Sequence, residues 1–386
     1  MWTRSRFPIS GSTAIVLALT APAARGTWSI VIADSHTKEL AAGIVTCNTG
    51  GDLLSLVQLA VGKGVGVCQA ASDPDGSRRP IIFEGLAAST APQNILNKLA
   101  KISGHDDRQY GIADTKGRVT TFTGSSTAPW TGGVVGSHGT MVYAIQGNIL
   151  VGSCVVPAIE RALRDTSGDV PAKLMAGLQE ARLAGGDRRC SCPDKSNPAD
   201  CGCPPPNFTK SGHRGSMLVA RIGDPDHIGS NSPKPKDDAR FLRLIVTCQN
   251  PEEKPDPVDG LQKQFDEWRA GLVGRPDAVQ SLVEFTPPTV KRGGSGTARV
   301  LITIHDWRRR RVTGPIRSLS VKHASESAGI SKVGEIRNNG DGTFTVALTT
   351  GEGLGTDSLL VTVDDGVRPV ILMPNPSLRY VGQPDP

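Results

Sequence analysis

The chain has 386 residues, of which 21% are charged and 38% hydrophobic, which is typical of a globular protein of two or three domains. Its formal net charge of +6 is modest, and the densest basic run, Arg308 to Arg311, has only Trp307 as an aromatic neighbour. A nucleic-acid surface usually interleaves several aromatic side chains with its positive charge. We therefore expect a solvated strand or loop at this run, no contact with an anionic polymer and no nucleic-acid partner.

The start of the chain has the pattern of a signal peptide. Two arginines precede a short apolar stretch at residues 12–19, and small residues follow. This stretch is shorter than the roughly 20 apolar residues that cross a bilayer, and no later segment is apolar for long enough. We expect residues 1–26 to be removed on export to the periplasm or the exterior, with no transmembrane segment. Cleavage after Gly26 leaves Thr27 as the first residue, whereas cleavage after Ala23 leaves Ala24.

The next 245 or so residues alternate blocks of strands with blocks of helices. Such blocks are typical of layered sheets covered by helices rather than of single βα units. Strands are predicted at 28–33, 39–47, 65–70, 110–114, 118–123, 141–145, 217–222 and 241–246. Helices are predicted at 89–102, 155–163, 171–184 and 258–272.

A change of pattern at residues 273–276 indicates a domain boundary. Only strands and turns are predicted beyond it, with the spacing of a β-sandwich. We expect a fold of class α+β, in which residues 278–386 form an all-β sandwich and residues 27–275 fold without it. The predicted strands of the sandwich are 281–285, 297–305, 319–322, 333–337, 343–348 and 358–363.

Thr27 opens the first predicted strand, where a β-branched residue is common in any case. Cleavage after Gly26 would give it a second use, because a hydroxyl nucleophile and an α-amine with a pKa near 8 would then belong to one residue. The amine takes the proton of the hydroxyl, usually through a water molecule. The residue is thus either a structural strand residue or both nucleophile and base.

Five motifs between residue 27 and about residue 272 carry a family resemblance. In this order and spacing they resemble the DUF1028 family, which is grouped with the Ntn hydrolases. The resemblance implies a four-layer αββα fold for residues 27–274 and a nucleophile freed by removal of what precedes it. It further implies hydrolysis of an amide bond in a small molecule or peptide without a cofactor, and it names no substrate. The motifs are TWSIVIADSHTKELAAGIV, GVGVCQA, RQYGIADTKGRVTTFTG, YAIQGNILVG and AGGDRR.

Three side-chain amides in these motifs are candidates for the catalytic site. Gln146 and Asn148 flank Gly147 after a predicted strand, and Gln69 is a weaker candidate. Amides donate and accept without titrating, which suits the binding of an oxyanion or of a free amine. A structural turn with glycine at positive φ is the alternative for Gln146 to Asn148.

Asp187 and Arg188 are candidates for substrate binding. They could form a buried pair or bind a substrate carboxylate, or they follow a helix C-cap as a surface charge pair. The loop from Cys47 to Val61 departs from the family pattern, and the family fold places it near Thr27. Substrate preference therefore cannot be transferred from the family.

A cysteine-rich insertion follows at residues 190–210. Four thiolates could bind Zn²⁺, but common structural zinc sites separate paired ligands by two or more residues, and an exported protein is oxidised. We therefore expect two disulfides within the insertion and no metal site. Cys47 and Cys68 are expected to pair on neighbouring strands, with Cys154 and Cys248 in the core. The insertion contains Cys190, Cys192, Cys201 and Cys203.

The seven histidines show no ligand or triad spacing and are expected at the solvent. The carboxy-terminal segment NNGDGTFTVALTTGEGLGTDSLLVTVDDG is similar to the final strands of bacterial Ig-like domains of the invasin type. Such modules position or tether an enzyme, which predicts contact with the cell envelope. The alternative function is a catalytically silent Ntn-like scaffold that binds the envelope or matrix, and the first residue of the mature chain distinguishes the two.

Overall fold

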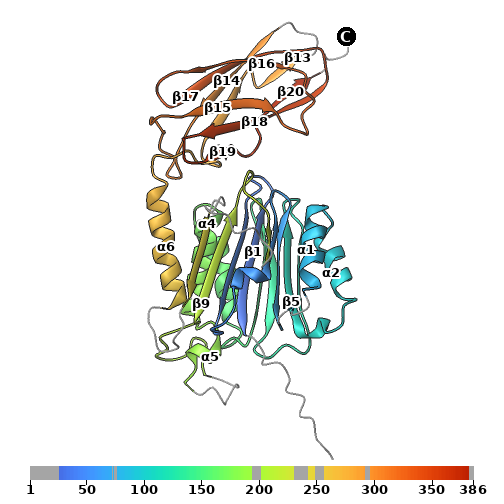
Figure 1. Ribbon diagram of the computed structural model, residues 1–386, viewed down its shortest axis with the longest axis vertical. Coiled ribbons are helices and arrows are strands. Elements are labelled where there is room, and N and C mark those ends of the chain that lie inside the picture. Colours follow the sequence, from blue (N-terminus) through green and yellow to red (C-terminus); the bar gives the residue numbers. More distant parts are fainter. Residues whose placement is uncertain are drawn as a thin grey trace, which may run out of the picture.

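The computed structural model describes residues 26–71, 73, 76–193, 201–229, 242–247, 256–291 and 296–381. The expected signal segment up to residue 25 and Cys248 lie outside the described residues. The described chain forms two parts, an amino-terminal part of layered sheets and helices and a carboxy-terminal all-β part (Figure 1).

The first sheet is antiparallel and has six strands in the order β11-β9-β2-β1-β8-β7. The strand β1 lies near its centre, and all eight of its residues are buried, because both faces of the sheet are covered. Its register places Thr27 opposite Thr46 on β2 and Asn148 on β8. The strands are β1 (Thr27–Asp34), β2 (Leu40–Thr46), β7 (Gly132–His138), β8 (Met141–Asn148), β9 (Arg214–Ala220) and β11 (Leu242–Thr247).

The second sheet, also antiparallel, has the order β10-β3-β4-β5-β6. It stacks on the first through a shared apolar core that includes Val31 and Ile44 from one sheet and Val65 and Ala113 from the other. Its strands are β3 (Val57–Ala60), β4 (Gly64–Ala70), β5 (Arg108–Asp114), β6 (Val119–Thr123) and β10 (His227–Ile228).

Helices cover the outer face of each sheet and complete the four αββα layers that the sequence predicts (Figure 1). Ile159, Leu174 and Leu261 pack on the first sheet, and Ile82 and Ile95 pack on the second. The first set of helices is α3 (Val155–Asp165), α4 (Val170–Leu183) and α6 (Pro257–Gly271), and the second is α1 (Arg78–Ala87) and α2 (Pro92–Leu99). Three shorter helices are η1 (Leu53–Leu56), η2 (His105–Asp107) and α5 (Arg188–Ser191).

The carboxy-terminal part is a two-sheet β-sandwich, as the Ig-like resemblance predicts. One sheet has the order β12-β14-β17-β16, and the other contains β13-β20-β18-β15 with β19 paired to β18. Val300, Val346 and Val361 belong to the core between them. The strands are β12 (Leu282–Thr286), β13 (Thr289–Lys291), β14 (Thr297–Thr303), β15 (Ser318–His323), β16 (Lys332–Asn338), β17 (Thr343–Thr349), β18 (Gly355–Asp364), β19 (Pro369–Ile371) and β20 (Ser377–Val381).

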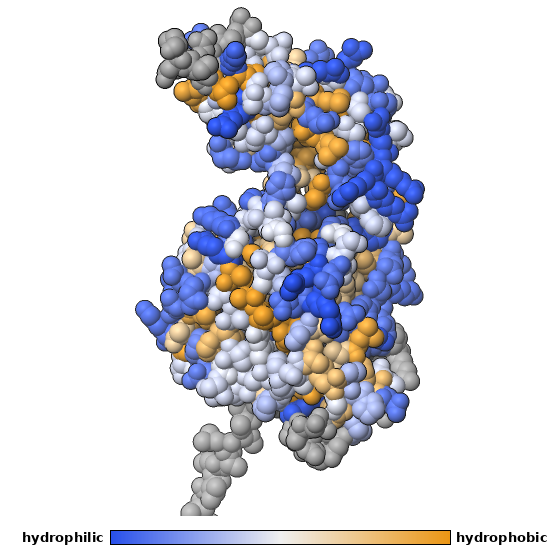
Figure 2. All heavy atoms as spheres, turned by 180° about the vertical axis from the view of Figure 1, so that it is seen from behind, coloured by the Kyte–Doolittle hydropathy of each residue, from blue (hydrophilic) through white to orange (hydrophobic). Residues whose placement is uncertain are grey.

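The two parts form separate lobes that meet across a narrow waist (Figure 2). None of the helices in the described ranges is both long enough and apolar enough to cross a membrane. The basic run Arg308 to Arg311 lies exposed between β14 and β15, as expected, and Arg308 stacks on Trp307 with 5.0 Å between its Cζ and the ring centroid.

Candidate functional site

Thr27 begins the strand β1 and is almost completely buried, with 3% of its surface exposed. Its hydroxyl lies 3.4 Å from Thr46 Oγ1, and its backbone carbonyl accepts a hydrogen bond from Gln69 Nε2 at 3.2 Å. Asn148 is its register partner on β8. A strand paired along both edges is fixed by backbone hydrogen bonds, so the position of the Thr27 backbone is well defined.

Two donors hold the carbonyl oxygen of Gly26, the residue before Thr27. Arg189 Nη2 donates to this oxygen at 2.8 Å, and Thr46 Oγ1 donates to it as well. A carbonyl oxygen that faces a guanidinium and a hydroxyl is polarised, and the same donors would stabilise the negative charge of a tetrahedral intermediate.

Asp187 fixes the guanidinium of Arg189. It is fully buried at the amino end of α5, and Arg189 donates to its two oxygens at 3.0 Å from Nε and 2.6 Å from Nη2. Asp187 also accepts from the backbone N–H of Cys47 at 3.1 Å, and Arg189 Nη1 donates to Asn48 Oδ1 at 3.0 Å. A bidentate pair of this kind sets both the position and the plane of the guanidinium.

The α-carbon of Gly26 has no room for a side chain. An added Cβ would lie 2.8 Å from Asp187 Oδ2, 2.8 Å from Ile149 Cβ and 2.9 Å from Arg189 Nη2. These distances are far shorter than the 3.5–4.0 Å of favourable carbon contacts. The fold therefore requires glycine at this position for steric reasons, since Gly26 is not among the residues with positive φ.

The side-chain amides form a buried polar layer between the two sheets behind Thr27. Ser29 Oγ donates to Gln69 Oε1 at 2.6 Å, and Gln146 Nε2 donates to Ser29 Oγ. Gln69 Nε2 donates to Gln109 Oε1 at 3.0 Å, and Gln109 Nε2 donates to the carbonyl of Gly147 at 2.9 Å. Fully paired polar networks in a core are rigid, because each lost partner leaves a buried group unsatisfied.

The structure therefore brings Gln69 and Asn148 to Thr27. Gln146 lies two residues farther along β1, where it contacts Ser29. The turn considered for residues 146–148 is wrong, because all three belong to β8. Asp187 is buried and paired, but its partner is Arg189 and not Arg188, so the pair expected between Asp187 and Arg188 is wrong in its basic partner. The guanidinium beside Gly26 belongs to Arg189, which sequence reasoning missed together with Gln109 and Thr46.

A small cavity of about 70 Å³ opens beside Thr27. It is lined by Thr27, Thr46 and Gln69 on one side and by the loop 48–56 on the other. This is the loop that departs from the family pattern, and the structure places it next to Thr27, as expected. This volume exceeds the roughly 10–15 Å³ that one water molecule requires, so the cavity has room for water beside Thr27.

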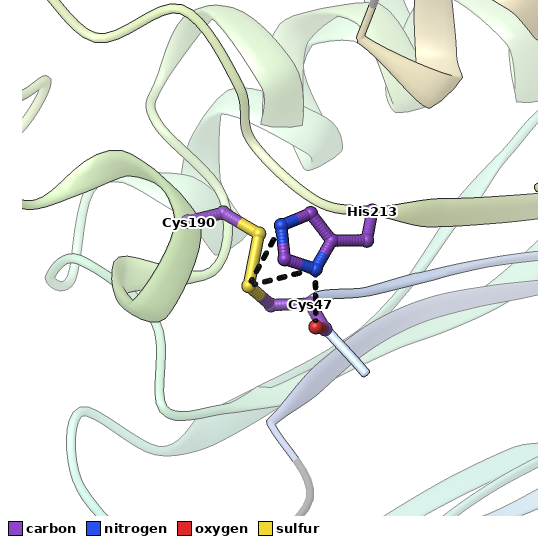
Figure 3. Close-up of side chains that lie close together, drawn as sticks. All are labelled: Cys47, Cys190 and His213. Carbon is purple, nitrogen blue, oxygen red and sulfur yellow. Dashed lines mark hydrogen bonds between the residues drawn. A yellow bond between two sulfur atoms is a disulfide. The ribbon is translucent and has the colours of Figure 1, made fainter. Parts of the chain in front are cut away.

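A disulfide between Cys47 and Cys190 ties the end of β2 to α5 beside this site (Figure 3). His213 Nδ1 lies 2.7 Å from the carbonyl oxygen of Cys47, and the ring contacts Cys47 Sγ at 3.7 Å. The three side chains are close enough to hold a metal ion. In the disulfide, however, neither sulfur is the thiolate that zinc requires.

The cysteine pairing differs from the expected one. All four cysteines of the insertion are oxidised, but only Cys192 and Cys201 pair within it, while Cys203 pairs with Cys154 and Cys190 with Cys47. Pairing of Cys47 with Cys68 is wrong, because β2 and β4 belong to different sheets. Cys68 is a free thiol in the core under α1 and α2, where burial raises its pKa to about 12.

Two histidines also depart from the expected solvent exposure. His213 is 7% exposed and bonded to the end of β2, and His227 is 1% exposed, with Nε2 2.7 Å from the carbonyl of Leu54. Both therefore serve to anchor the loop 48–56 and its flanks.

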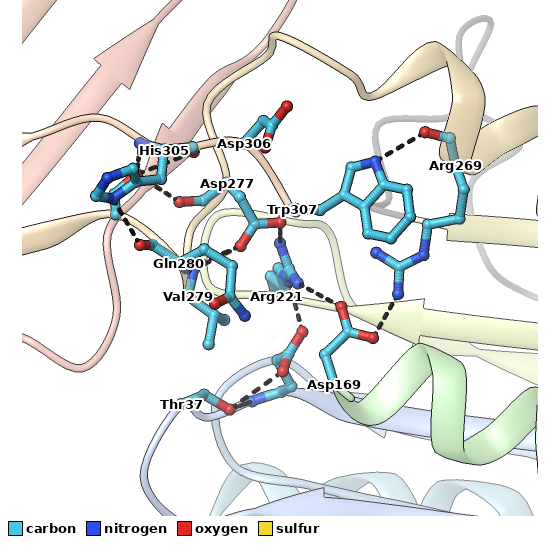
Figure 4. Close-up of polar contacts among 12 residues, drawn as sticks. Thr37, Asp169, Arg221, Arg269, Asp277, Val279, Gln280, His305, Asp306 and Trp307 are labelled. Carbon is cyan, nitrogen blue, oxygen red and sulfur yellow. Dashed lines mark hydrogen bonds and ion pairs between the residues drawn. The ribbon is translucent and has the colours of Figure 1, made fainter. Parts of the chain in front are cut away.

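A larger cavity of about 900 Å³ lies between the two lobes, at the other end of β1. Asp34, the last residue of β1, lines it, as do Arg269 and Trp307. Thr27 and Asp34 are separated by roughly 23 Å at 3.3 Å per strand residue. Two acidic residues of its lining are paired within the first lobe, Asp169 with Arg269 and Glu39 with Arg221, and Arg221 also pairs with Asp277 at the boundary of the second lobe (Figure 4).

Comparisons with known proteins match part of the first lobe to a family model. Residues 27–197 match the family model described as "Family of unknown function (DUF1028)". A solved DUF1028 protein from Silicibacter pomeroyi is 19% identical over 63% of this chain and 85% of its own, with a TM-score of 0.45. No curated protein matches the chain.

Other solved structures that match include adhesins. The adhesin InvE of Yersinia pseudotuberculosis is 24% identical over 27% of this chain and 27% of its own, with a TM-score of 0.20. Invasin, a bacterial integrin-binding protein, is 9% identical over 93% of this chain and 60% of its own, with a TM-score of 0.22. Residues 27–197 thus match the DUF1028 family model, which the motifs from Thr27 to Arg189 predict, and a two-sheet β-sandwich follows in the same chain.

Proposed function

We propose that the chain is an exported amidohydrolase of the Ntn type, with Thr27 as an amino-terminal nucleophile. The observation that carries the proposal is the carbonyl of Gly26, which lies directly before the candidate nucleophile and faces both Arg189 and Thr46. A carbonyl bound in this way at the start of a central strand has the surroundings of a bond about to be cleaved.

In the proposed reaction, removal of residues 1–26 frees the amine of Thr27. This amine takes the proton of the Thr27 hydroxyl while the oxygen attacks the carbonyl carbon of an amide. Arg189 and Thr46 donate to the resulting oxyanion. The C–N bond then breaks, the leaving amine takes the proton, and water hydrolyses the ester on Thr27 to release the acid. No cofactor takes part in these steps.

Three disulfides support export, because such bonds persist in oxidising compartments. We propose the periplasm or the exterior as the location. The β-sandwich in the same chain supports contact with the cell envelope. It also supports the second candidate function, a scaffold of the same fold that binds the envelope or matrix and hydrolyses nothing.

The test pairs the first residue of the mature chain with hydrolysis of a panel of acyl amides. We expect mass spectrometry to find Thr27 at the terminus, Thr27→Ala to abolish turnover and Thr27→Ser to keep part of it. Circular dichroism of both variants should match the wild type, since Thr27 packs only at the tip of its strand. A mature chain that begins at Ala24 and hydrolyses amides equally fast would contradict the mechanism, and a chain that hydrolyses none would favour the scaffold.

A further inference from the structure

We infer that the acyl site of this enzyme accepts glycyl or acetyl amides and excludes acyl groups with an L side chain on the α-carbon. The inference rests on the proposed function of Thr27. It follows from the space around Gly26, since the residue that is bonded to the nucleophile before cleavage occupies the place that a substrate acyl group takes afterwards.

The donors that bind the carbonyl oxygen of Gly26 must also bind the carbonyl oxygen of a substrate acyl group. Thr27 can form an ester only with a carbonyl carbon next to its hydroxyl, and Arg189 and Thr46 are the donors that face the oxygen in that place. An acyl group whose oxygen binds these two donors therefore has its α-carbon where the α-carbon of Gly26 lies. The shape of the protein around this atom becomes the specificity of the site.

Asp187 and Ile149 border the space around the α-carbon of Gly26, and we call them its two walls. Hydrogen bonds hold both of them in place. Asp187 Oδ2, 2.8 Å from a Cβ at position 26, belongs to a fully buried carboxylate that accepts from the N–H of Cys47 and from Arg189. Ile149 has a left-handed backbone with φ of 56°, and its N–H donates to the carbonyl of Ala128 at 3.1 Å.

The backbone on the other side of Ile149 is fixed as well. Its carbonyl accepts from the N–H of Arg188 at 3.1 Å, and Leu150 forms an isolated β-bridge with Asp187. The two walls are therefore tied to each other, and neither can retreat for a methyl group without breaking a backbone hydrogen bond. Overpacking of a tight site costs about 1–3 kcal/mol, which corresponds to a rate difference of roughly 5- to 150-fold.

The experiment measures kcat/KM of the mature full chain on four amides of one fluorogenic amine: acetyl, glycyl, L-alanyl and L-leucyl. We expect the better of the acetyl and glycyl amides to exceed the L-alanyl amide by at least about tenfold and the L-leucyl amide by more. The comparison of acetyl with glycyl shows whether the α-amino group of the acyl part contributes to binding.

A variant makes the test specific for this wall. Ile149→Gly removes the Cβ that lies 2.8 Å from a Cβ at position 26 and suits the positive φ of this position. We expect it to raise the ratio of L-alanyl to glycyl turnover at least about threefold, whereas the conservative core change Ile32→Val, at the far end of β1, leaves the ratio unchanged. Because a ratio is measured on one sample, partial loss of folded protein does not affect it.

The outcomes separate the two proposals. Turnover of L-alanyl or L-leucyl amides at or above the rate of the glycyl and acetyl amides would overturn the acyl specificity and leave Thr27 as nucleophile. An unchanged ratio in Ile149→Gly would overturn the role of this wall. Absence of turnover on all four amides, in a chain shown to begin at Thr27, would overturn the proposed function and the specificity with it.

Discussion

Arg189 is the residue whose chemistry is least exchangeable at the site. It makes contacts to three partners at once, the carboxylate of Asp187, the amide of Asn48 and the carbonyl of Gly26. Only the planar fork of a guanidinium serves them together, because a lysine ammonium is a single charge on a flexible stem.

We therefore predict that Arg189→Lys lowers kcat for amide hydrolysis about 10²- to 10³-fold, the usual effect of losing one oxyanion donor. The matched control is Arg188→Lys, the neighbouring residue of the same helix, which should keep activity within about threefold of the wild type. Steady-state kinetics on the amide panel measure both. Equal losses in the two variants would mean that the position of the helix, not the contact to the carbonyl, is what matters.

At this scale the sequence predicted the types of residue better than their contacts. Gln69, Asn148 and Asp187 lie at the site: Gln69 donates to the carbonyl of Thr27, Asn148 is the register partner of Thr27, and Asp187 pairs with Arg189. Arg189 was missed because two adjacent arginines are alike in the sequence, and only the helical turn after Asp187 decides which one returns to the strand.

At the scale of elements, the disulfides divide into one long and two shorter connections. Cys47–Cys190 has a sequence separation of 143, and Cys192–Cys201 has one of 9. The chain-entropy estimate gives about 5 kcal/mol for the first loop and about 2.6 kcal/mol for the second. The long connection should therefore stabilise the lobe more, and it also ties β2 to the helix that carries Arg189.

We predict that replacing Cys47 and Cys190 together by alanine lowers the free energy of unfolding by about 2–5 kcal/mol and slows amide hydrolysis. The pair Cys192→Ala with Cys201→Ala is the control, and it should cost about 2.5 kcal/mol less and leave the rate unchanged. Urea denaturation of oxidised protein gives the free energies. If the variant without Cys47 and Cys190 loses less free energy of unfolding than the control variant, α5 stays in place without this disulfide.

The predicted bounds of strands and helices were most accurate where apolar residues recur at a regular spacing. The strands from 28–33 and 141–145 and the helix from 155–163 are present within a few residues. The strand β7 was missed because its sequence, GGVVGSH, is rich in glycine and lies exposed at the edge of its sheet. The helix α1 was missed because Pro80 and the preceding Asp-Gly pattern indicate a turn.

At the scale of the whole molecule, the lobes are joined by ion pairs at the end of the sheet opposite Thr27 (Figure 4). Arg221, after β9, pairs with Glu39 at 2.6 Å and with Asp277 at 3.0 Å. Arg269 stacks on Trp307, with 4.7 Å from its Cζ to the ring centroid, and Trp307 Nε1 donates to the carbonyl of Arg269 at 2.9 Å. We propose a domain boundary at residues 274–278, but Asp277 belongs by its contacts to both lobes.

These contacts have consequences for truncation. A chain of residues 27–275 should still fold, because its sheets and helices bury their own core. It loses Asp277 as a partner of Arg221 and Trp307 as a partner of Arg269, so it should be less stable than the same lobe in the full chain. We therefore expect the lobes to be separable in fold but coupled in stability, which urea denaturation of the two chains would measure.

Asp277 gives this coupling a dependence on pH. Burial raises the pKa of Asp277, but the charge of Arg221 and the N–H groups of Val279 and Gln280 lower it more, so that the pKa lies below its ordinary value. A carboxyl group with a depressed pKa in the folded state stabilises the fold above its unfolded pKa, about 3.9 for aspartate. This stability is lost as the pH falls through the folded pKa.

We predict that Asp277→Asn lowers the free energy of unfolding by about 1–3 kcal/mol at pH 7, because a hydrogen bond to a charged group is lost while Asn still accepts from Val279 and Gln280. The difference between variant and wild type should shrink as the pH falls below about 4, where this carboxyl begins to take up a proton in the unfolded wild type before it does so in the folded one. Urea denaturation between pH 7 and pH 3 measures this difference, and Asp266→Asn, a change on the exposed face of α6, should show none at any pH. A difference that stays constant down to pH 3 would mean that the shape of the side chain, and not the charge facing Arg221, holds the lobes together.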